Sequence, residues 1–201
     1  MSVEIIEISE TIRARIEYDT DPMSPTEWSN LGEIVYRSDR HTLGTKRVSS
    51  DELEDISSKI QSGEYVGLPV YAHVHGGFSL STGPFSCPWD SGQSGFVYCT
   101  KKKAIAEFGK KTLTARAREA TLRCLKAEVE TFHQYLNGDV YQVIIERPDG
   151  EHLDSCYGFY GLSYAIEEAK AMGAHRLEQD QKEATEALYW AERGVETHAD
   201  F

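Results

Sequence analysis

The sequence predicts an α+β fold in which helices pack on one face of a mostly antiparallel sheet. Short segments of alternating apolar and polar residues are followed by turn residues, which is typical of strands joined in hairpins. Other segments repeat their apolar residues every three or four positions, so one helical face is apolar. A final stretch rich in Ala and Glu predicts a long C-terminal helix. Hairpin-like strands and one-faced helices together favour the α+β class.

Two strands are predicted at the start of the chain. Residues 3–8 favour β-structure, and within residues 12–18 the apolar side chains alternate with charged ones, so we expect an antiparallel pair. Ser24-Pro25-Thr26-Glu27 combines a typical N-cap residue with proline at the first helical position. This combination predicts a short helical turn that carries Trp28, and we expect residues 31–37 to extend from it.

A helix and a longer strand follow. Ser49-Ser50-Asp51-Glu52 fits a capping box, and apolar residues continue at helical spacing until Ser62-Gly63. In residues 66–74 every second side chain is apolar, which places Tyr71, His73 and His75 together on the other face of a strand.

The segment Pro84–Gln93 gathers a thiol, an indole, a carboxylate, two hydroxyls and an amide between prolines and glycines. Because proline fixes its own φ and restricts the residue before it, we expect this loop to hold one arrangement. Such a loop suits a functional site or a stiff structural corner. Residues 95–99 then predict a strand, and residues 101–108 predict a short helix that ends at Gly109.

The strongest helical pattern lies between residues 113 and 136 and ends at Asn137-Gly138. Its apolar residues are Leu122, Leu125, Val129, Phe132 and Leu136. Residues 140–146 and 153–157 predict a hairpin, and residues 163–193 predict the C-terminal helix, with Gly173 as a candidate interruption and residues 194–201 frayed. We expect one main domain, residues 1–161, and a helical segment, residues 162–201, packed on it.

Composition predicts a soluble, cytoplasmic protein with one substantial core. The chain has 201 residues, 40% of them hydrophobic, with no apolar run long enough to span a membrane and no signal-peptide pattern at its start. The cysteines are widely spaced and include no Cys-x-x-Cys pair, so neither a disulfide framework nor a zinc ribbon is expected.

The formal net charge of −12 argues against direct binding of nucleic acid or anionic membranes. Residues 1–35 hold eight acidic and two basic residues, whereas residues 101–126 hold nine basic and two acidic ones. An acidic surface attracts basic proteins and can occupy grooves built for phosphate backbones. Solubility alone is the simpler explanation, because such a charge is ordinary on soluble domains.

Four segments together resemble a family of small proteins encoded by tailed bacteriophages and prophages, whose activity is not assigned. The segments are residues 24–32 (SPTEWSNLG), 87–93 (CPWDSGQ), 137–141 (NGDVY) and 155–161 (SCYGFYG). The resemblance implies a phage or mobile-element origin. Small non-structural phage proteins often disable host machinery or host immunity, so by association the resemblance implies an inhibitor.

The leading expectation is an acidic protein that binds and inhibits a bacterial host protein with a basic surface. A CRISPR or restriction component is the kind of defence or nucleic-acid-handling factor that fits. No cofactor is expected, and the residues favour a binding protein over an enzyme. We expect the binding residues in the shaped loop, in residues 155–161 and among the N-terminal acids: Trp89, Ser91, Gln93, Ser155, Cys156, Tyr160, Glu17, Asp19, Asp21 and Glu27.

The alternative is a cysteine-dependent hydrolase or transferase. A thiol nucleophile needs a nearby base, and the base needs an acid that orients it. The residues that fit these roles are the nucleophile Cys87, the base His75 or His73, and the acid Asp90 or Asp139. Against this hypothesis, Cys87 precedes Pro88 and so does not begin a helix whose N-terminus would lower the pKa of its thiol.

A zinc site would require four residues to converge, namely His73, His75, Cys87 and Cys156. A His-x-His pair on a strand is frequently just an exposed polar face, so no metal is expected.

Overall fold

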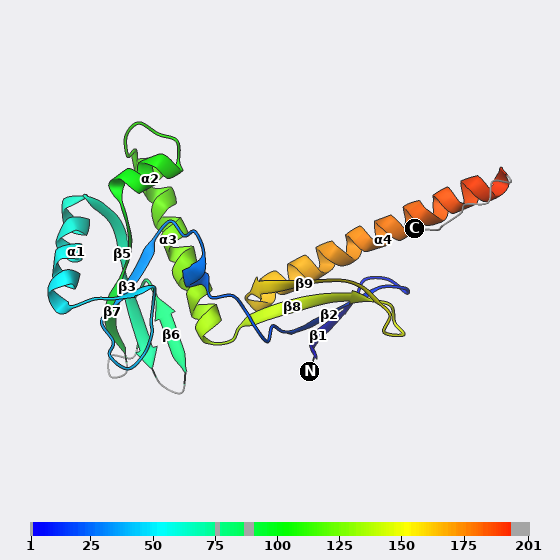
Figure 1. Cartoon of the computed structure of the whole chain (residues 1–201), viewed down its shortest axis with the longest axis horizontal. Coiled ribbons are helices and arrows are strands. Elements are labelled where there is room, and N and C mark those ends of the chain that lie inside the picture. Colours follow the sequence, from blue (N-terminus) through cyan, green and yellow to red (C-terminus); the bar gives the residue numbers. More distant parts are fainter. Residues whose placement is uncertain (1, 75–76, 87–90, 194–201) are drawn as a thin grey trace. The chain divides into compact units, whose positions relative to one another are not determined.

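The computed structural model describes residues 2–74, 77–86 and 91–193 of the chain. Contacts between Cα atoms divide the chain into two compact units. Unit 1 comprises Met1–Pro22 and Val140–Phe201, and unit 2 comprises Met23–Asp139. The fold is α+β, as predicted, because helices accompany two mostly antiparallel sheets and the last helix is long (Figure 1). In this described part of the chain, no helix is long and apolar enough to cross a membrane.

Unit 1 is built on a four-stranded antiparallel sheet with the order β1-β2-β8-β9. The strands are β1 (Ser2–Glu7), β2 (Arg13–Tyr18), β8 (Val140–Glu146) and β9 (His152–Tyr160). Both predicted hairpins, β1–β2 and β8–β9, are confirmed. The pairing of β2 with β8 joins the hairpins and brings segments that are far apart in the sequence into one sheet.

One helix, α4 (Leu162–Glu192), covers one face of the unit 1 sheet. Ala165 and Ala169 are fully buried in a cluster with strand residues such as Val143. A Cβ atom added at Gly173 would lie 2.5 Å from Cγ1 of Ile8, so this glycine permits close packing. The helix runs through Gly173 without a break, and the candidate interruption there is wrong.

Unit 2 contains a five-stranded sheet with the order β4-β3-β7-β5-β6, in which only β3 and β4 pair in parallel. Its elements in chain order are η1 (Pro25–Glu27), β3 (Glu33–Tyr36), β4 (Lys46–Arg47), α1 (Ser50–Ser62), β5 (Tyr65–Val74), β6 (Phe78–Ser81), β7 (Ser91–Thr100), α2 (Lys101–Glu107) and α3 (Ala115–Leu136).

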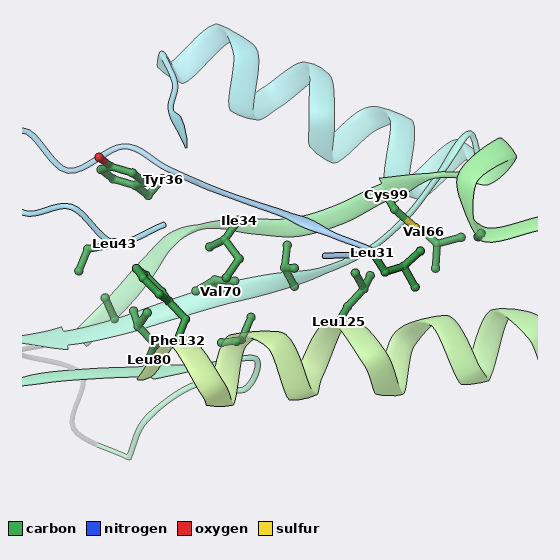
Figure 2. Packing of buried hydrophobic residues seen from close by; sticks show 14 residues of the cluster. Leu31, Ile34, Tyr36, Leu43, Val66, Val70, Leu80, Cys99, Leu125 and Phe132 are labelled. Carbon is green, nitrogen blue, oxygen red and sulfur yellow. The ribbon is translucent and has the colours of Figure 1, made fainter. Parts of the chain in front are cut away.

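Helices lie on both faces of the unit 2 sheet, whereas the sequence predicts them on one face only. Leu125 and Phe132 of α3 point into a cluster of strand residues, as Figure 2 shows. Val97 of β7 joins that cluster, while its neighbour Phe96 joins the cluster of Ile56 on α1. Because successive side chains of a strand point to opposite faces, β7 contributes to both cores.

Most elements agree with the predictions, and the differences have local causes. The capping box at the start of α1 is present, with Ser49 and Glu52 bonded reciprocally. Residues 31–37, expected to extend the turn at Trp28, instead contain strand β3, which pairs with β7. Strands β4 and β6 have two and four residues and were not predicted, because such short segments carry no readable alternation.

The two units divide the chain differently from the expected boundary between residues 161 and 162. Helix α4 shares its core with β2 and β8, so it belongs to the same unit as these strands. The pairing of β2 with β8 closes that unit and leaves residues 23–139 as an insertion between them.

Candidate interaction surface

Several residues of the enzyme hypothesis lie outside the described ranges, namely His75, Cys87, Trp89 and Asp90. That hypothesis therefore stays a prediction. His73, the alternative base, stands on β5 opposite Ser79 and Ser91, and its ring centroid lies 5.8 Å from that of Phe85. Asp139, the alternative acid, follows α3 and donates its backbone N–H to a carbonyl in the last turns of that helix.

The zinc hypothesis gains no support from the described residues. They contain no group of three or more His, Cys, Asp or Glu side chains that could hold a metal ion. His73 belongs to unit 2 and Cys156 to unit 1, while the other two candidates lie outside the described ranges.

The end of the shaped loop is part of a strand, because β7 begins at Ser91. The side-chain amide of Gln93 donates to the carbonyl of Gly95 at 3.3 Å, and the hydroxyl of Ser94 donates to the carbonyl of Val70 at 3.2 Å. The register of β5 and β7 shifts at this point. Gln93, predicted as a binding residue, is exposed and makes this contact within its own strand, and its role in binding stays a prediction.

The whole net charge of the protein lies in unit 1. Unit 1 contains 19 Asp and Glu residues against seven Lys and Arg, which leaves −12. Unit 2 contains 14 of each kind, which leaves zero. The basic segment 101–126 is thus balanced within its own unit, whereas unit 1 has no such balance.

Most basic side chains of unit 1 are engaged by acids of the same unit. Arg13 and Arg15 bind Glu146, and Arg147 and Arg176 bind Asp180. Burial by itself raises the pKa of Asp180, but the two arginines outweigh burial and lower that pKa below its usual value. Lys182 likewise pairs with Glu178. Because these cations are paired with acids of the same unit, the surplus acids dominate the electrostatic field around unit 1.

Three of the predicted binding acids lie at the end of β2 and just after it. Glu17 pairs with Arg15 and accepts a hydrogen bond of 3.1 Å from the amide of Gln142. Asp19 accepts from the backbone N–H of Asp21 at 3.0 Å through one oxygen. Glu27, the fourth predicted acid, lies in η1 of unit 2.

Asp19 also joins the N-terminal acids to the segment 155–161. Its second carboxylate oxygen accepts a hydrogen bond of 3.2 Å from the backbone N–H of Gly158. Gly158 has a φ of +78°, a conformation that other residues rarely adopt, so glycine is needed where β9 bends toward Asp19. The acid Asp19 and the segment 155–161, which were predicted separately as binding residues, are therefore in contact.

Aromatic rings form a row across the same end of the sheet. Tyr18 stacks on Tyr141 with a centroid distance of 5.2 Å, and Tyr141 stands opposite Phe159 in the strand register. Phe159 meets Tyr164 of α4 edge to face at 5.9 Å. Tyr141 and Phe159 are buried, whereas Tyr18 and Tyr164 are about half exposed at 53% and 49%.

Exposed tyrosines and acids thus share one region of unit 1, the tyrosine–acid patch, defined as Tyr18, Asp19, Tyr157, Tyr164 and Glu168. Tyr157, next to Gly158 in the chain, is 62% exposed. Glu168 raises the pKa of Tyr164 through its charge and a hydrogen bond. The other residues predicted in β9 are placed nearby, with Tyr160 half-buried opposite Val140 and Cys156 an exposed free thiol.

The C-terminal half of α4 carries a second exposed stretch of unit 1. The helix continues past the strands of its own unit, with Leu188 67% and Tyr189 47% exposed. In Figure 1 this part of α4 has no strand of unit 1 beside it. Arg193 lies over the ring of Tyr189, 3.7 Å from its centroid. The segment exposes apolar surface beside the acids Glu183, Glu186 and Glu192.

Comparisons of the chain with protein-family models, with curated proteins and with solved structures find no match. The surface is therefore interpreted from its own chemistry. Sequence reasoning identified Asp19 but neither Glu168 nor the exposed tyrosines, because whether a Tyr faces a core or solvent depends on which strands pair. The Tyr-rich composition of residues 155–164 was the available signal.

Proposed function

We propose that the protein is encoded by a phage or mobile element and binds and inhibits a bacterial host protein that has a basic surface. The single observation that carries the proposal is the confinement of the net charge of −12 to unit 1. A charge surplus concentrated on one unit attracts a basic partner from a distance and favours one orientation of approach.

The tyrosine–acid patch adds side chains that can make close contacts with a partner, which net charge alone does not provide. Tyr side chains combine a large apolar ring with a hydroxyl that can hydrogen-bond, and they are enriched among the residues that dominate binding energy at interfaces. Of the large hydrophobic side chains that the described structure exposes, six belong to unit 1: Ile5, Tyr18, Tyr157, Tyr164, Leu188 and Tyr189. Acids around exposed tyrosines suit a partner rich in Arg and Lys, because guanidinium and ammonium groups pair with both.

The kind of partner follows from this chemistry. Bacterial proteins that handle nucleic acid present positive surfaces for phosphate backbones, and an acidic surface can occupy them. The resemblance of four segments to proteins of tailed bacteriophages and prophages supports a host defence or nucleic-acid-handling factor as the target. Inhibition would result from occupying the surface that the target uses for nucleic acid.

A pull-down from bacterial lysate with three forms of the tagged protein tests the proposal. The first form is wild type, and the second reverses exposed acids of unit 1 with Glu10→Lys, Asp21→Lys and Glu183→Lys. We expect wild type to retain a stoichiometric protein with a basic surface, which mass spectrometry identifies and added salt releases. The unit 1 variant should lose it, because attraction between exposed charges depends on their sign and is screened by salt.

The third form is a matched control that reverses exposed acids of unit 2 with Glu54→Lys, Glu64→Lys and Glu130→Lys. It changes the total charge by the same amount, so it should retain the partner if the location of the charge matters. Equal loss in both variants, or retention by both, would contradict the assignment of the surface to unit 1. Inhibition is tested separately by adding wild type to the nucleic-acid-binding assay of the identified partner.

A further inference from the structure

Unit 2 contains a pocket of about 510 Å³ whose lining includes none of the residues of the tyrosine–acid patch. Its walls come from residues 26–33, from the end of β7 and from the start of α2. Trp28, Glu33, Tyr98 and Lys103 are among the lining residues. A volume of several hundred Å³ suits a small organic molecule and exceeds the size of one amino-acid side chain.

The wall formed by residues 26–33 is held in place by several hydrogen bonds. The side-chain amide of Asn30 donates to the carbonyl of Pro25 at 2.7 Å. The carboxylate of Glu128 on α3 accepts the backbone N–H groups of Leu31 and Gly32 at 2.6 and 2.9 Å. A Cβ atom at Gly32 would lie 2.4 Å from Cδ2 of Leu125, so this strand entry packs tightly on α3. The pocket is therefore preformed.

The carboxylate of Glu33 can accept hydrogen bonds on one side of the pocket. The hydroxyl of Tyr98 donates to Glu33 at 3.0 Å. Burial, and then the neighbouring Glu33, raise the pKa of Tyr98 far above its usual value, so the hydroxyl keeps its proton and orients the carboxylate. In the described part of the chain, the carboxylate of Glu33 accepts this hydrogen bond through Oε2, and its Oε1 can accept hydrogen bonds from a ligand.

The pocket lining also contains the ammonium group of Lys103 and the aromatic side chains of Trp28 and Tyr98. Nζ of Lys103 donates to the carbonyl of Asn30 at 2.7 Å, which fixes the ammonium at the rim and leaves its other protons for an anion. Lys101 and Lys102 precede it at the start of α2. Trp28 exposes 40% of its surface, and Tyr98 stacks on Tyr65 with a centroid distance of 4.8 Å.

We propose that this pocket binds a purine nucleotide of the guanine type. The ring system would lie against Trp28 of the pocket wall, the neighbouring N–H donors of the guanine edge would face Glu33, and the phosphate would pair with Lys103. A carboxylate accepts hydrogen bonds only, so it suits guanine, which presents adjacent donors, better than adenine, which also presents an acceptor there. Aromatic stacking contributes to either purine alike. The inference does not rest on the proposed function.

Isothermal titration of the full chain with GMP, guanosine and AMP tests this proposal. We expect GMP to bind more tightly than AMP by a factor on the order of ten, because a matched pair of hydrogen bonds discriminates between bases by such a factor. GMP should also bind more tightly than guanosine, because of the phosphate. Absence of binding by GMP at millimolar concentration, or equal affinity for GMP and AMP, would overturn the proposal without any substitution.

Two substitutions assign the roles within the pocket. Glu33→Gln should reduce the ratio of GMP to AMP affinity toward one, since the amide offers a donor in place of an acceptor. Lys103→Ala should reduce the ratio of GMP to guanosine affinity toward one. The matched controls Glu130→Gln and Lys126→Ala, at exposed positions of α3, should leave both ratios unchanged. If Glu33→Gln leaves the ratio of GMP to AMP affinity unchanged and Lys103→Ala leaves the ratio of GMP to guanosine affinity unchanged, the roles assigned to these two residues are wrong.

Discussion

Glu146 on β8 shows at the scale of single residues how unit 1 holds its cations. It is 3% exposed, and its Oε1 accepts a hydrogen bond of 2.7 Å from Nε of Arg13. Its Oε2 accepts from Nε and an Nη of Arg15 at 3.1 and 3.0 Å. Burial by itself raises the pKa of Glu146, but the hydrogen bonds from Arg15 and Arg13 outweigh burial and hold that pKa below its usual value.

Replacing this carboxylate tests its contribution to stability. Glu146→Gln leaves two guanidinium groups facing a neutral amide, and breaking a buried ion pair destabilises by several kcal/mol. Because the arginine side chains remain 26% and 28% exposed, we expect a smaller loss of about 2 kcal/mol in the free energy of unfolding, measured with urea. The control Glu151→Gln removes a looser pair of 3.9 Å with Arg147 and should change stability little.

The same carboxylate predicts a dependence of stability on pH. The pKa of Glu146 is lower in the folded than in the unfolded chain, so its contribution is present above the ordinary value of 4.5 and is lost as pH falls through the folded pKa. We therefore expect the stability difference between wild type and Glu146→Gln to be largest near neutral pH. It should shrink below pH 4.5 in urea unfolding curves. A difference that stayed constant down to pH 3 would exclude the ion pair as its cause.

At the scale of elements, the close contact between α4 and the N-terminal hairpin depends on Gly173. Gly173→Ala adds helix propensity worth about 1 kcal/mol, but its Cβ would lie 2.5 Å from Cγ1 of Ile8. Overpacking of a core commonly costs about 1–3 kcal/mol, so we expect a net loss of stability of about 1 kcal/mol. Urea unfolding measures this change in the free energy of unfolding. A variant more stable than wild type would show that the side chain of Ile8 moves aside at little cost.

A second substitution separates packing from helix propensity. Ile8→Ala removes all three side-chain atoms, Cγ1, Cδ1 and Cγ2, that a Cβ atom at Gly173 would meet. If overpacking is the cause, the double variant Ile8→Ala with Gly173→Ala should lose less stability than the sum of the single losses. Additive losses would point to another cause.

Elements could be predicted where the determinants are local. The capping box at Ser49 and the apolar stripe of α3 are complete within their own segments, and both are present in the structure. The pairing of β2 with β8 depends on residues that are far apart in the sequence, which no local pattern reports. For the same reason, neither the two units nor the helices on both faces of the unit 2 sheet followed from the sequence.

The candidate surface was predictable to a similar extent. The acids at the end of β2 stand out in the sequence, but the contact of Asp19 with Gly158 links positions that only the fold brings together. The exposed tyrosines of the patch could not be separated from buried Tyr141, because an aromatic residue in a strand fits a core or a surface equally well. The catalytic residues predicted around Cys87 lie outside the described ranges and stay a prediction.

At the scale of the whole molecule, charge is separated between two units of different character. Unit 2 is electrically balanced and contains the larger sheet and the pocket, whereas unit 1 carries the full surplus of −12 together with most of the exposed tyrosines. A charge surplus that served solubility alone would have no reason to coincide with exposed aromatic surface, which is normally kept small on soluble proteins. Their coincidence favours binding through unit 1.

The most direct test of this account is the affinity of the purified protein for its identified partner, measured over a series of salt concentrations. We predict that the affinity of wild type falls at least several-fold between about 0.05 and 0.5 M salt, because exposed charges are screened. The variant with reversed acids in unit 1 should bind weakly with little dependence on salt, and the unit 2 variant should behave as wild type. Affinities that are equal for all three proteins and independent of salt would contradict the central claim.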